Sequence, residues 1–165
     1  MRYAGIIPND TSNAGAGVCF SFYTQGCPHK CEGCQNPETW SFDGGYEFTT
    51  ETLNEIIEGI AANGITRNFC VLGGEPLCDE NVFLTYLVVE HVRKAYPNIR
   101  IYIWSGYTYD ELIHRSSSQR IKDVLKLCDF LIDGKYEQSL RDVTLPLRGS
   151  INQNIINLKQ VNADN

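Results

Sequence analysis

Three cysteines in one short segment are the residues of this chain best suited to chemistry. Cys27, Cys31 and Cys34 follow the spacing C-x3-C-x2-C directly after an apolar, strand-like run. Thiolates are soft ligands that suit zinc or an iron–sulfur centre. A structural zinc ion takes four protein ligands, whereas a 4Fe-4S cluster held by three cysteines keeps one iron open to a group that is not protein. The segment is therefore a candidate catalytic site.

A second motif follows another strand-like run. Gly73, Gly74 and Glu75 stand directly before Pro76, at the end of the apolar segment 68–72. Glycine lets the backbone approach a ligand closely, and a carboxylate accepts charged hydrogen bonds from an ammonium group. Because each motif ends an apolar strand, the two together are a stronger signal than either alone.

Strand-like and helix-like segments alternate along the chain, which predicts a parallel sheet. The predicted strands are 18–24, 68–72, 99–104 and 129–132, with a possible fifth at 154–158. Helical spacing of apolar residues predicts helices at 51–63 and 81–95 and one or two weaker helices within 109–126. Parallel α/β proteins build their sites on loops at the carboxyl ends of the strands. Four or five strands cannot close an eight-stranded barrel, so we expect an α/β fold with a partial, open β/α barrel of four to five mainly parallel strands.

The composition predicts one domain that covers residues 1–165. Of the 165 residues, 42% are hydrophobic and 21% are charged, and a chain of this length can bury a proper core. Residues 1–17 form a polar lead-in without clear periodicity, and the tail is less regular from about residue 140. The net charge of −6 argues against a nucleic-acid partner, since no basic stripe is present to neutralise phosphates.

Hydropathy and cysteine use favour a cytoplasmic protein without a membrane partner. No apolar run approaches the ~18 residues that span a bilayer, and the first ten residues lack the apolar core of a signal peptide. Three of the seven cysteines are grouped at ligand spacing, which fits a reducing compartment better than a disulfide framework. We expect the others, Cys19, Cys70, Cys78 and Cys128, to be small buried apolar residues.

The two motifs resemble those of the radical S-adenosylmethionine (SAM) superfamily. The resemblance implies that Cys27, Cys31 and Cys34 bind three irons of a 4Fe-4S cluster and that SAM chelates the fourth through its amino and carboxylate groups. It implies that one electron from the reduced cluster cleaves SAM into methionine and a 5′-deoxyadenosyl radical. The cofactor carries this hard chemistry, and the protein supplies positioning and exclusion of water.

The resemblance also assigns residues around SAM. Gly73, Gly74 and Glu75 match the motif that holds the SAM amino group, and the backbone around Gly33 and Gln35 is expected to lie against SAM. Many members of the superfamily place an aromatic residue before the third cysteine, where it contacts the adenine. This chain has Gly33 there, so another residue or the backbone alone must cover the adenine.

Further motifs are similar to those of the activating proteins of anaerobic ribonucleotide reductases. They are the segments 36–40, 104–108, 131–136 and 148–153, which occur in the same order and with similar spacing. This similarity implies an oxidoreductase that takes a hydrogen atom from a glycine of an anaerobic (class III) ribonucleoside-triphosphate reductase and leaves a glycyl radical there. It also implies a low-potential electron donor such as a flavodoxin or a ferredoxin.

Two other interpretations remain open. The shared motifs also fit another small radical SAM enzyme that acts on a purine-like small molecule. A non-catalytic zinc module would use the three cysteines with His29 or a distant cysteine as the fourth ligand, but it leaves the segment 73–76 without a role. We expect His29 to be exposed and not to be a ligand, and Trp104 either to line the site or to pack in the core.

Overall fold

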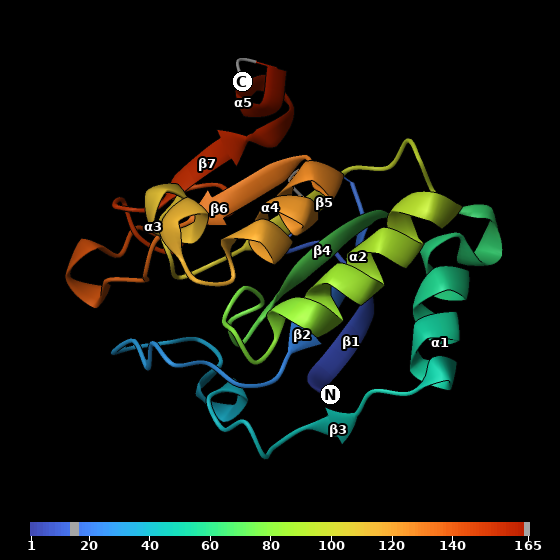
Figure 1. The fold of residues 1–165 in the computed structure, drawn as a ribbon, viewed down its shortest axis with the longest axis horizontal. Helices are drawn as coiled ribbons and strands as arrows, with labels where there is room; N and C mark the ends of the chain where they lie inside the picture. The colour runs from blue at the N-terminus through green and yellow to red at the C-terminus, as the bar shows by residue number, and fades with distance from the viewer. Residues whose placement is uncertain (14–16, 164–165) are drawn as a thin grey trace.

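A seven-stranded sheet with four parallel strands at its centre frames the computed structural model, which describes residues 1–13 and 17–163 (Figure 1). The strands are β1 (Arg2–Asp10), β2 (Cys19–Thr24), β3 (Tyr46–Glu47), β4 (Asn68–Gly73), β5 (Ile101–Trp104), β6 (Phe130–Asp133) and β7 (Asn154–Asn157). Their order in the sheet is β3-β1-β2-β4-β5-β6-β7. Strands β2, β4, β5 and β6 pair in parallel, and β1, β3 and β7 are antiparallel to their neighbours. The fold is therefore α/β with a mixed, open sheet.

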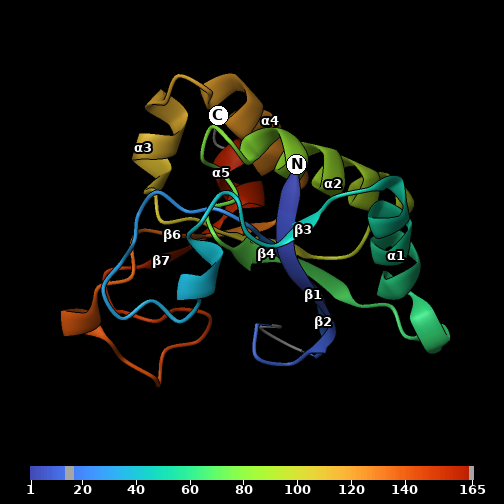
Figure 2. The same ribbon diagram turned by 90° about the horizontal axis from the view of Figure 1, so that it is seen from below.

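Helices lie in the connections between the parallel strands, and α1, α2 and α4 lie together on one side of the sheet (Figure 2). The helices are α1 (Thr50–Ile60), α2 (Val82–Ala95), α3 (Tyr109–His114), α4 (Ser118–Leu127) and α5 (Leu158–Ala163), with short 3-10 turns at Pro37–Thr39, Ala62–Gly64 and Gln138–Leu140. Helix α1 begins at a capping box in which the Thr49 hydroxyl accepts the N–H of Thr52. None of the described helices is long and apolar enough to cross a membrane.

The main core lies between the sheet and these helices. Its fully buried side chains from the central strands include Phe20, Phe22, Phe69, Val71, Ile101, Ile103 and Leu131. The opposite face of the same strands carries a second, smaller cluster made of Cys19, Cys70, Leu72, Tyr102 and Ile132. Because both faces are covered, the central strands are apolar at successive positions instead of alternating.

The segment after β6 covers part of the second face. Leu147 packs against the smaller cluster, and the Trp104 indole N–H donates a hydrogen bond of 2.8 Å to the Leu147 carbonyl oxygen. A single bridge between Arg141 and Ser150 holds this segment in a loop. The tail that looks irregular in the sequence therefore forms a wall over the helix-free side of the sheet.

All the segments predicted as strands and helices are present, with small shifts at their ends, and the weak helical segment 109–126 contains both α3 and α4. The expected strand number and direction need correction. Strands β1 and β3 raise the number from four or five to seven, and the predicted fifth strand, β7, is antiparallel. The three parallel pairs of the sheet are matched by three antiparallel ones.

No strand is predicted within the polar lead-in, but its residues 2–10 form β1. Most of this strand is half-buried or exposed, so it lacks the strict alternation that marks a strand in a sequence. It exists because it pairs with β2, with Ile6 opposite Phe22. Pro8 is tolerated because the pairing register shifts between Ile7 and Asp10. Positions 14–16 of the lead-in lie outside the described residues.

Candidate active site

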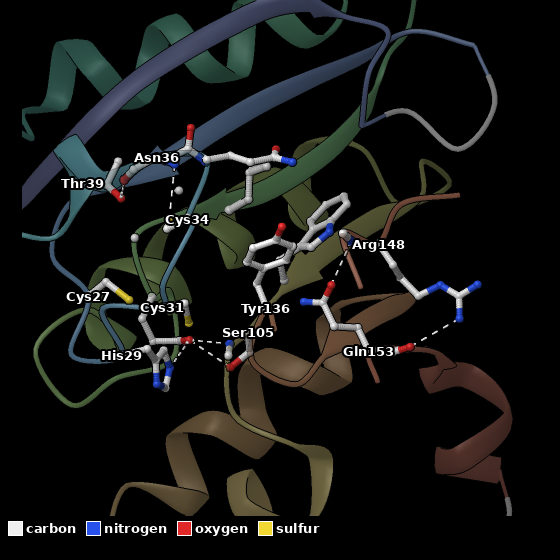
Figure 3. A pocket seen from close by; sticks show the side chains of 18 of the residues that line it. Cys27, His29, Cys31, Cys34, Asn36, Thr39, Ser105, Tyr136, Arg148 and Gln153 are labelled. Atoms are coloured by element: carbon white, nitrogen blue, oxygen red, sulfur yellow. Dashed lines mark hydrogen bonds and ion pairs between the residues drawn. The ribbon is translucent and has the colours of Figure 1, made fainter. Parts of the chain in front are cut away.

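A cavity of about 360 Å³ lies at the carboxyl ends of the parallel strands. The loops that follow β2, β4, β5 and β6 all contribute to it, because parallel strands place these loops at one edge of the sheet. Predicted site residues that line the cavity are Cys27, Cys31, Cys34, Gln35, Gly73, Gly74 and Glu75. In Figure 3 the three cysteines lie on one side of it and Arg148 lies on the other. Trp104 also lines the cavity.

Gly33 is in the same loop but is not among the described residues that line the cavity. Its φ of +75° lies in the left-handed region, and a Cβ placed there would come within 2.8 Å of the Gln138 side chain. An aromatic residue at this position would therefore be strained. The backbone thus gives a physical reason for glycine at this position.

The cysteine loop folds back onto the segment that follows it. The N–H groups of Gly26 and Cys27 donate to the carbonyl oxygens of Thr39 and Trp40, at 2.7 and 3.1 Å. The N–H of Asn36 points at the Cys34 sulfur, at 3.4 Å. These bonds close the loop, and its three thiols line the cavity.

Burial changes the acidity of two of the three thiols. Burial raises the pKa of Cys27 to about 11, and the negative charge of Glu75 adds to this effect. Burial and the neighbouring Cys34 raise the pKa of Cys31. Without a cation, the Cys27 thiol is therefore protonated at neutral pH. A bound metal centre would supply the positive charge that releases the proton, as thiolate ligands require.

The arrangement of the three thiols suits a cluster in which each cysteine binds a different iron. The described residues contain no group of three or more His, Cys, Asp or Glu side chains gathered around one point, as a single metal ion would need. A cubane cluster asks for something different, because each cysteine binds its own iron. Three half-buried thiols spread along the wall of one cavity meet that requirement.

Glu75 lies at the meeting point of three loops. Its Oε1 accepts hydrogen bonds from the Leu77 N–H and the Ser105 hydroxyl, both at 2.9 Å. Its Oε2 accepts from the Gly106 N–H at 2.6 Å and contacts the Nε2 of His29 at 2.8 Å. The side chain is only 1% exposed. The carboxylate therefore ties together the loops that follow β2, β4 and β5.

The expectation that His29 is exposed is wrong, because its side chain is only 6% exposed and is paired with Glu75. A single histidine between two cysteines in a polar loop carries no sequence signal of such a partner. Ser105 and Gly106 were also outside the predicted site. Their position directly after a predicted strand was the available signal, since the loops at one edge of a parallel sheet meet. The four scattered cysteines are all buried, as predicted.

Comparisons with known proteins agree with a cluster protein. Residues 13–156 match the family model of a 4Fe-4S single cluster domain. An anaerobic ribonucleoside-triphosphate reductase-activating protein of Salmonella typhi is 36% identical over 160 residues, which is 96% of this chain and 100% of the relative. Proteins of the same name from Escherichia coli (strain K12) and Enterobacteria phage T4 are each 34% identical, over 96% and 94% of this chain and 100% and 93% of their own lengths.

Proposed function

This chain belongs to the family of anaerobic ribonucleoside-triphosphate reductase-activating proteins, and we propose that it generates a glycyl radical on an anaerobic (class III) ribonucleotide reductase. The reaction proposed is reductive cleavage of SAM at a 4Fe-4S cluster. One observation carries the proposal: the three cysteines and the loop 73–75 line the same cavity. A soft ligand set and a glycine-rich loop that can approach a ligand closely are thereby available to one bound molecule.

In this proposal each part of the cavity has a task. Cys27, Cys31 and Cys34 hold three irons, and the bound cluster supplies the electron that splits the sulfonium–carbon bond of SAM. The backbone of the loop 73–75 holds the methionine end of SAM, and Gln35 lies beside it. The deoxyadenosyl radical takes a hydrogen atom from a glycine α-carbon, which yields 5′-deoxyadenosine and a glycine-centred radical that its neighbouring amides stabilise.

The proposal also explains how an open sheet could serve the reaction. We regard the four central parallel strands as a partial β/α barrel of the radical SAM type, with its cavity at the carboxyl edge. A substrate that is itself a protein loop brings its own walls, so a barrel that remains open can admit it. A low-potential donor such as a flavodoxin or ferredoxin, in a reducing cytoplasm, is part of this proposal, because a reduced cluster and free thiols need both.

The proposal is tested by anaerobic transfer. Reduced, cluster-loaded protein is mixed with SAM and the anaerobic reductase, and electron paramagnetic resonance is recorded alongside chromatography of the products. We expect a glycine-centred radical on the reductase, with 5′-deoxyadenosine and methionine formed alongside it. The purified protein should carry about four irons and four sulfides per chain, which separates a cubane from a zinc module.

Two controls make the result decisive. The Cys31→Ala variant and a mixture without SAM should both give no radical. SAM cleavage without a glycyl radical on the reductase, under conditions where a known activating protein succeeds, would refute the assignment. That outcome would favour the alternative of a radical SAM enzyme that acts on a purine-like small molecule.

A further inference from the structure

We propose that His29 is a positioning residue that fixes the cysteine loop, residues 27–34, against the loop 73–75. The inference rests on the proposed function, because it concerns how the same site binds SAM. It also assigns the carboxylate of Glu75 to this link between loops, and leaves the SAM ammonium group to backbone oxygens.

The first argument is the saturation of the Glu75 carboxylate. An ionised carboxylate offers about four acceptor sites. All four are engaged within the protein: Leu77 and Ser105 reach Oε1, and His29 and Gly106 reach Oε2. An ammonium group could join this carboxylate only by displacing one of these partners. Glu75 therefore influences SAM through the loops that it holds.

The second argument is the confinement of the imidazole ring. A Cβ on Gly106 would overlap the His29 ring, so only glycine fits on that side. The Tyr107 ring meets the imidazole edge to face, with centroids 4.5 Å apart, and the Arg115 guanidinium lies over the Tyr107 ring at 3.9 Å. These neighbours pack against the ring in the orientation in which Nε2 faces Glu75.

The third argument is that the rest of the cysteine loop needs this link. In the described part of the chain, the backbone bonds between the two loops lie just before the first cysteine: the Gly74 N–H donates to the Thr24 carbonyl oxygen at 2.9 Å, and the Glu75 N–H to the Gly26 carbonyl oxygen at 2.8 Å. Lys30, in the middle of the loop, has a φ of +50°, a left-handed conformation that a non-glycine residue keeps only when its surroundings fix it. The bond from His29 fixes the loop one residue before that position.

A matched pair of variants tests the link. In His29→Gln the amide nitrogen can reach the place of Nε2, whereas in His29→Asn it stops near the place of Nδ1. Both variants are loaded with cluster, and SAM is titrated against the spectrum of the reduced cluster. We expect the Gln variant to bind SAM within about threefold of the native protein. The Asn variant should bind about tenfold more weakly or worse, at an unchanged iron content.

A double-mutant cycle with Glu75→Gln then tests the assignment of the carboxylate. If Glu75 acts through His29, the variant with both His29→Asn and Glu75→Gln should bind SAM within about threefold of Glu75→Gln alone. If Glu75 binds the ammonium group directly, the two losses should multiply. Multiplication would overturn the assignment of Glu75.

Further outcomes decide the rest. His91→Asn, at an exposed histidine of α2, is the control and should match the native protein. Native-like SAM binding by His29→Asn, or equal weakening by Asn and Gln, would overturn the proposal. If His29→Asn fails to hold iron, hydrogen exchange of the backbone amides of residues 30–34 is measured in iron-free protein. Faster exchange in the Asn variant than in the Gln variant would support the link, and equal rates would refute it. A native protein whose spectrum ignores SAM would instead refute the proposed function.

Discussion

The cysteines of this chain differ in their surroundings, and the difference distinguishes the candidate cluster ligands from the cysteines of the core. Cys27, Cys31 and Cys34 are half-buried beside a cavity, whereas Cys128 is fully buried among apolar side chains. Burial raises the pKa of Cys128 to about 12, so this thiol is protonated and packs as an apolar group. Metal ligation needs access as well as sulfur.

Replacing one cluster cysteine should abolish the centre. Cys31→Ala should lose the 4Fe-4S absorption and SAM cleavage, because in the proposed assignment each of the three thiolates holds a separate iron. Cys128→Ala should keep both, with a loss of about 1 kcal/mol of unfolding free energy for the missing side-chain atom. Iron analysis and SAM turnover measure the difference. The ligand assignment fails if Cys128→Ala loses the cluster and Cys31→Ala retains it.

Asp10 is a buried carboxylate whose effect depends on pH. Burial alone would raise its pKa, but hydrogen bonds from Ser21, Asn13 and Ser12 lower it below the ordinary value of 3.8. A folded pKa below the unfolded one stabilises the protein at pH values above about 4, and this stabilisation disappears as the pH falls through the folded pKa.

Asp10→Asn should therefore be less stable than the native protein by about 1–2 kcal/mol at pH 7, because an amide turns a donor toward neighbours that are themselves donors. Urea unfolding at pH 7 and at about pH 3 would measure it. The gap between the two proteins should shrink on acidification. A gap that stays constant would contradict the charge-based explanation.

Helix α1 illustrates how a distant residue completes an element. Its last carbonyl groups, and those of the turn that follows, accept hydrogen bonds from the buried guanidinium of Arg67, which reaches Gly59, Ala62 and Ile65 at 2.8–3.2 Å. The Arg67 Nε also donates to Asn9 of β1, at 2.9 Å. One side chain thus satisfies the open end of a helix and joins it to a strand.

Arg67→Met should destabilise the protein by about 3 kcal/mol, because several half-buried carbonyl groups and the Asn9 side chain lose their donor. The matched control is Arg100→Met, at an exposed arginine, which should change the unfolding free energy by less than about 0.5 kcal/mol. Denaturant unfolding of both variants gives the comparison. Similar losses at the two positions would show that the cap contributes nothing.

Local sequence patterns were sufficient to predict some secondary-structure elements and gave no indication of others. The run from Cys19 to Thr24 is apolar at four of its six positions and rich in aromatic residues, so the strand could be predicted from the sequence. Strand β1 could not, because partners from β2 and β3 stabilise it and its own residues are half-exposed. The link from His29 to Glu75 spans 46 residues, and no local pattern encodes a contact of that length.

At the scale of the whole molecule, the site is built from loops that belong to different strands. Cys27 follows β2, Glu75 follows β4 and Gly106 follows β5. The motifs predicted that these loops belong to one edge. Side-chain bonds that only the folded chain can form determine which groups face the cavity and which face one another.

Loading the cluster should raise the thermal stability of the whole domain, because a group that binds the folded chain more tightly than the unfolded one shifts the equilibrium. Anaerobic circular dichroism of loaded and iron-free protein should show the higher midpoint for the loaded form. The chelator that removes iron from the native protein should leave the thermal unfolding midpoint of Cys31→Ala unchanged. Equal unfolding midpoints for the loaded and the iron-free native protein would contradict this prediction.

The order in which the ribosome makes these loops sets the time at which the site can mature. The cysteine loop emerges first, Glu75 follows His29 by 46 residues and Gly106 follows Glu75 by 31. At about 10 residues per second, the thiols wait roughly 8 seconds for their supports. The proposed site is therefore complete only after the segment that holds Gly106 has been made. Burial raises the pKa of the Cys27 thiol to about 11, and a protonated thiol is oxidised more slowly than a thiolate.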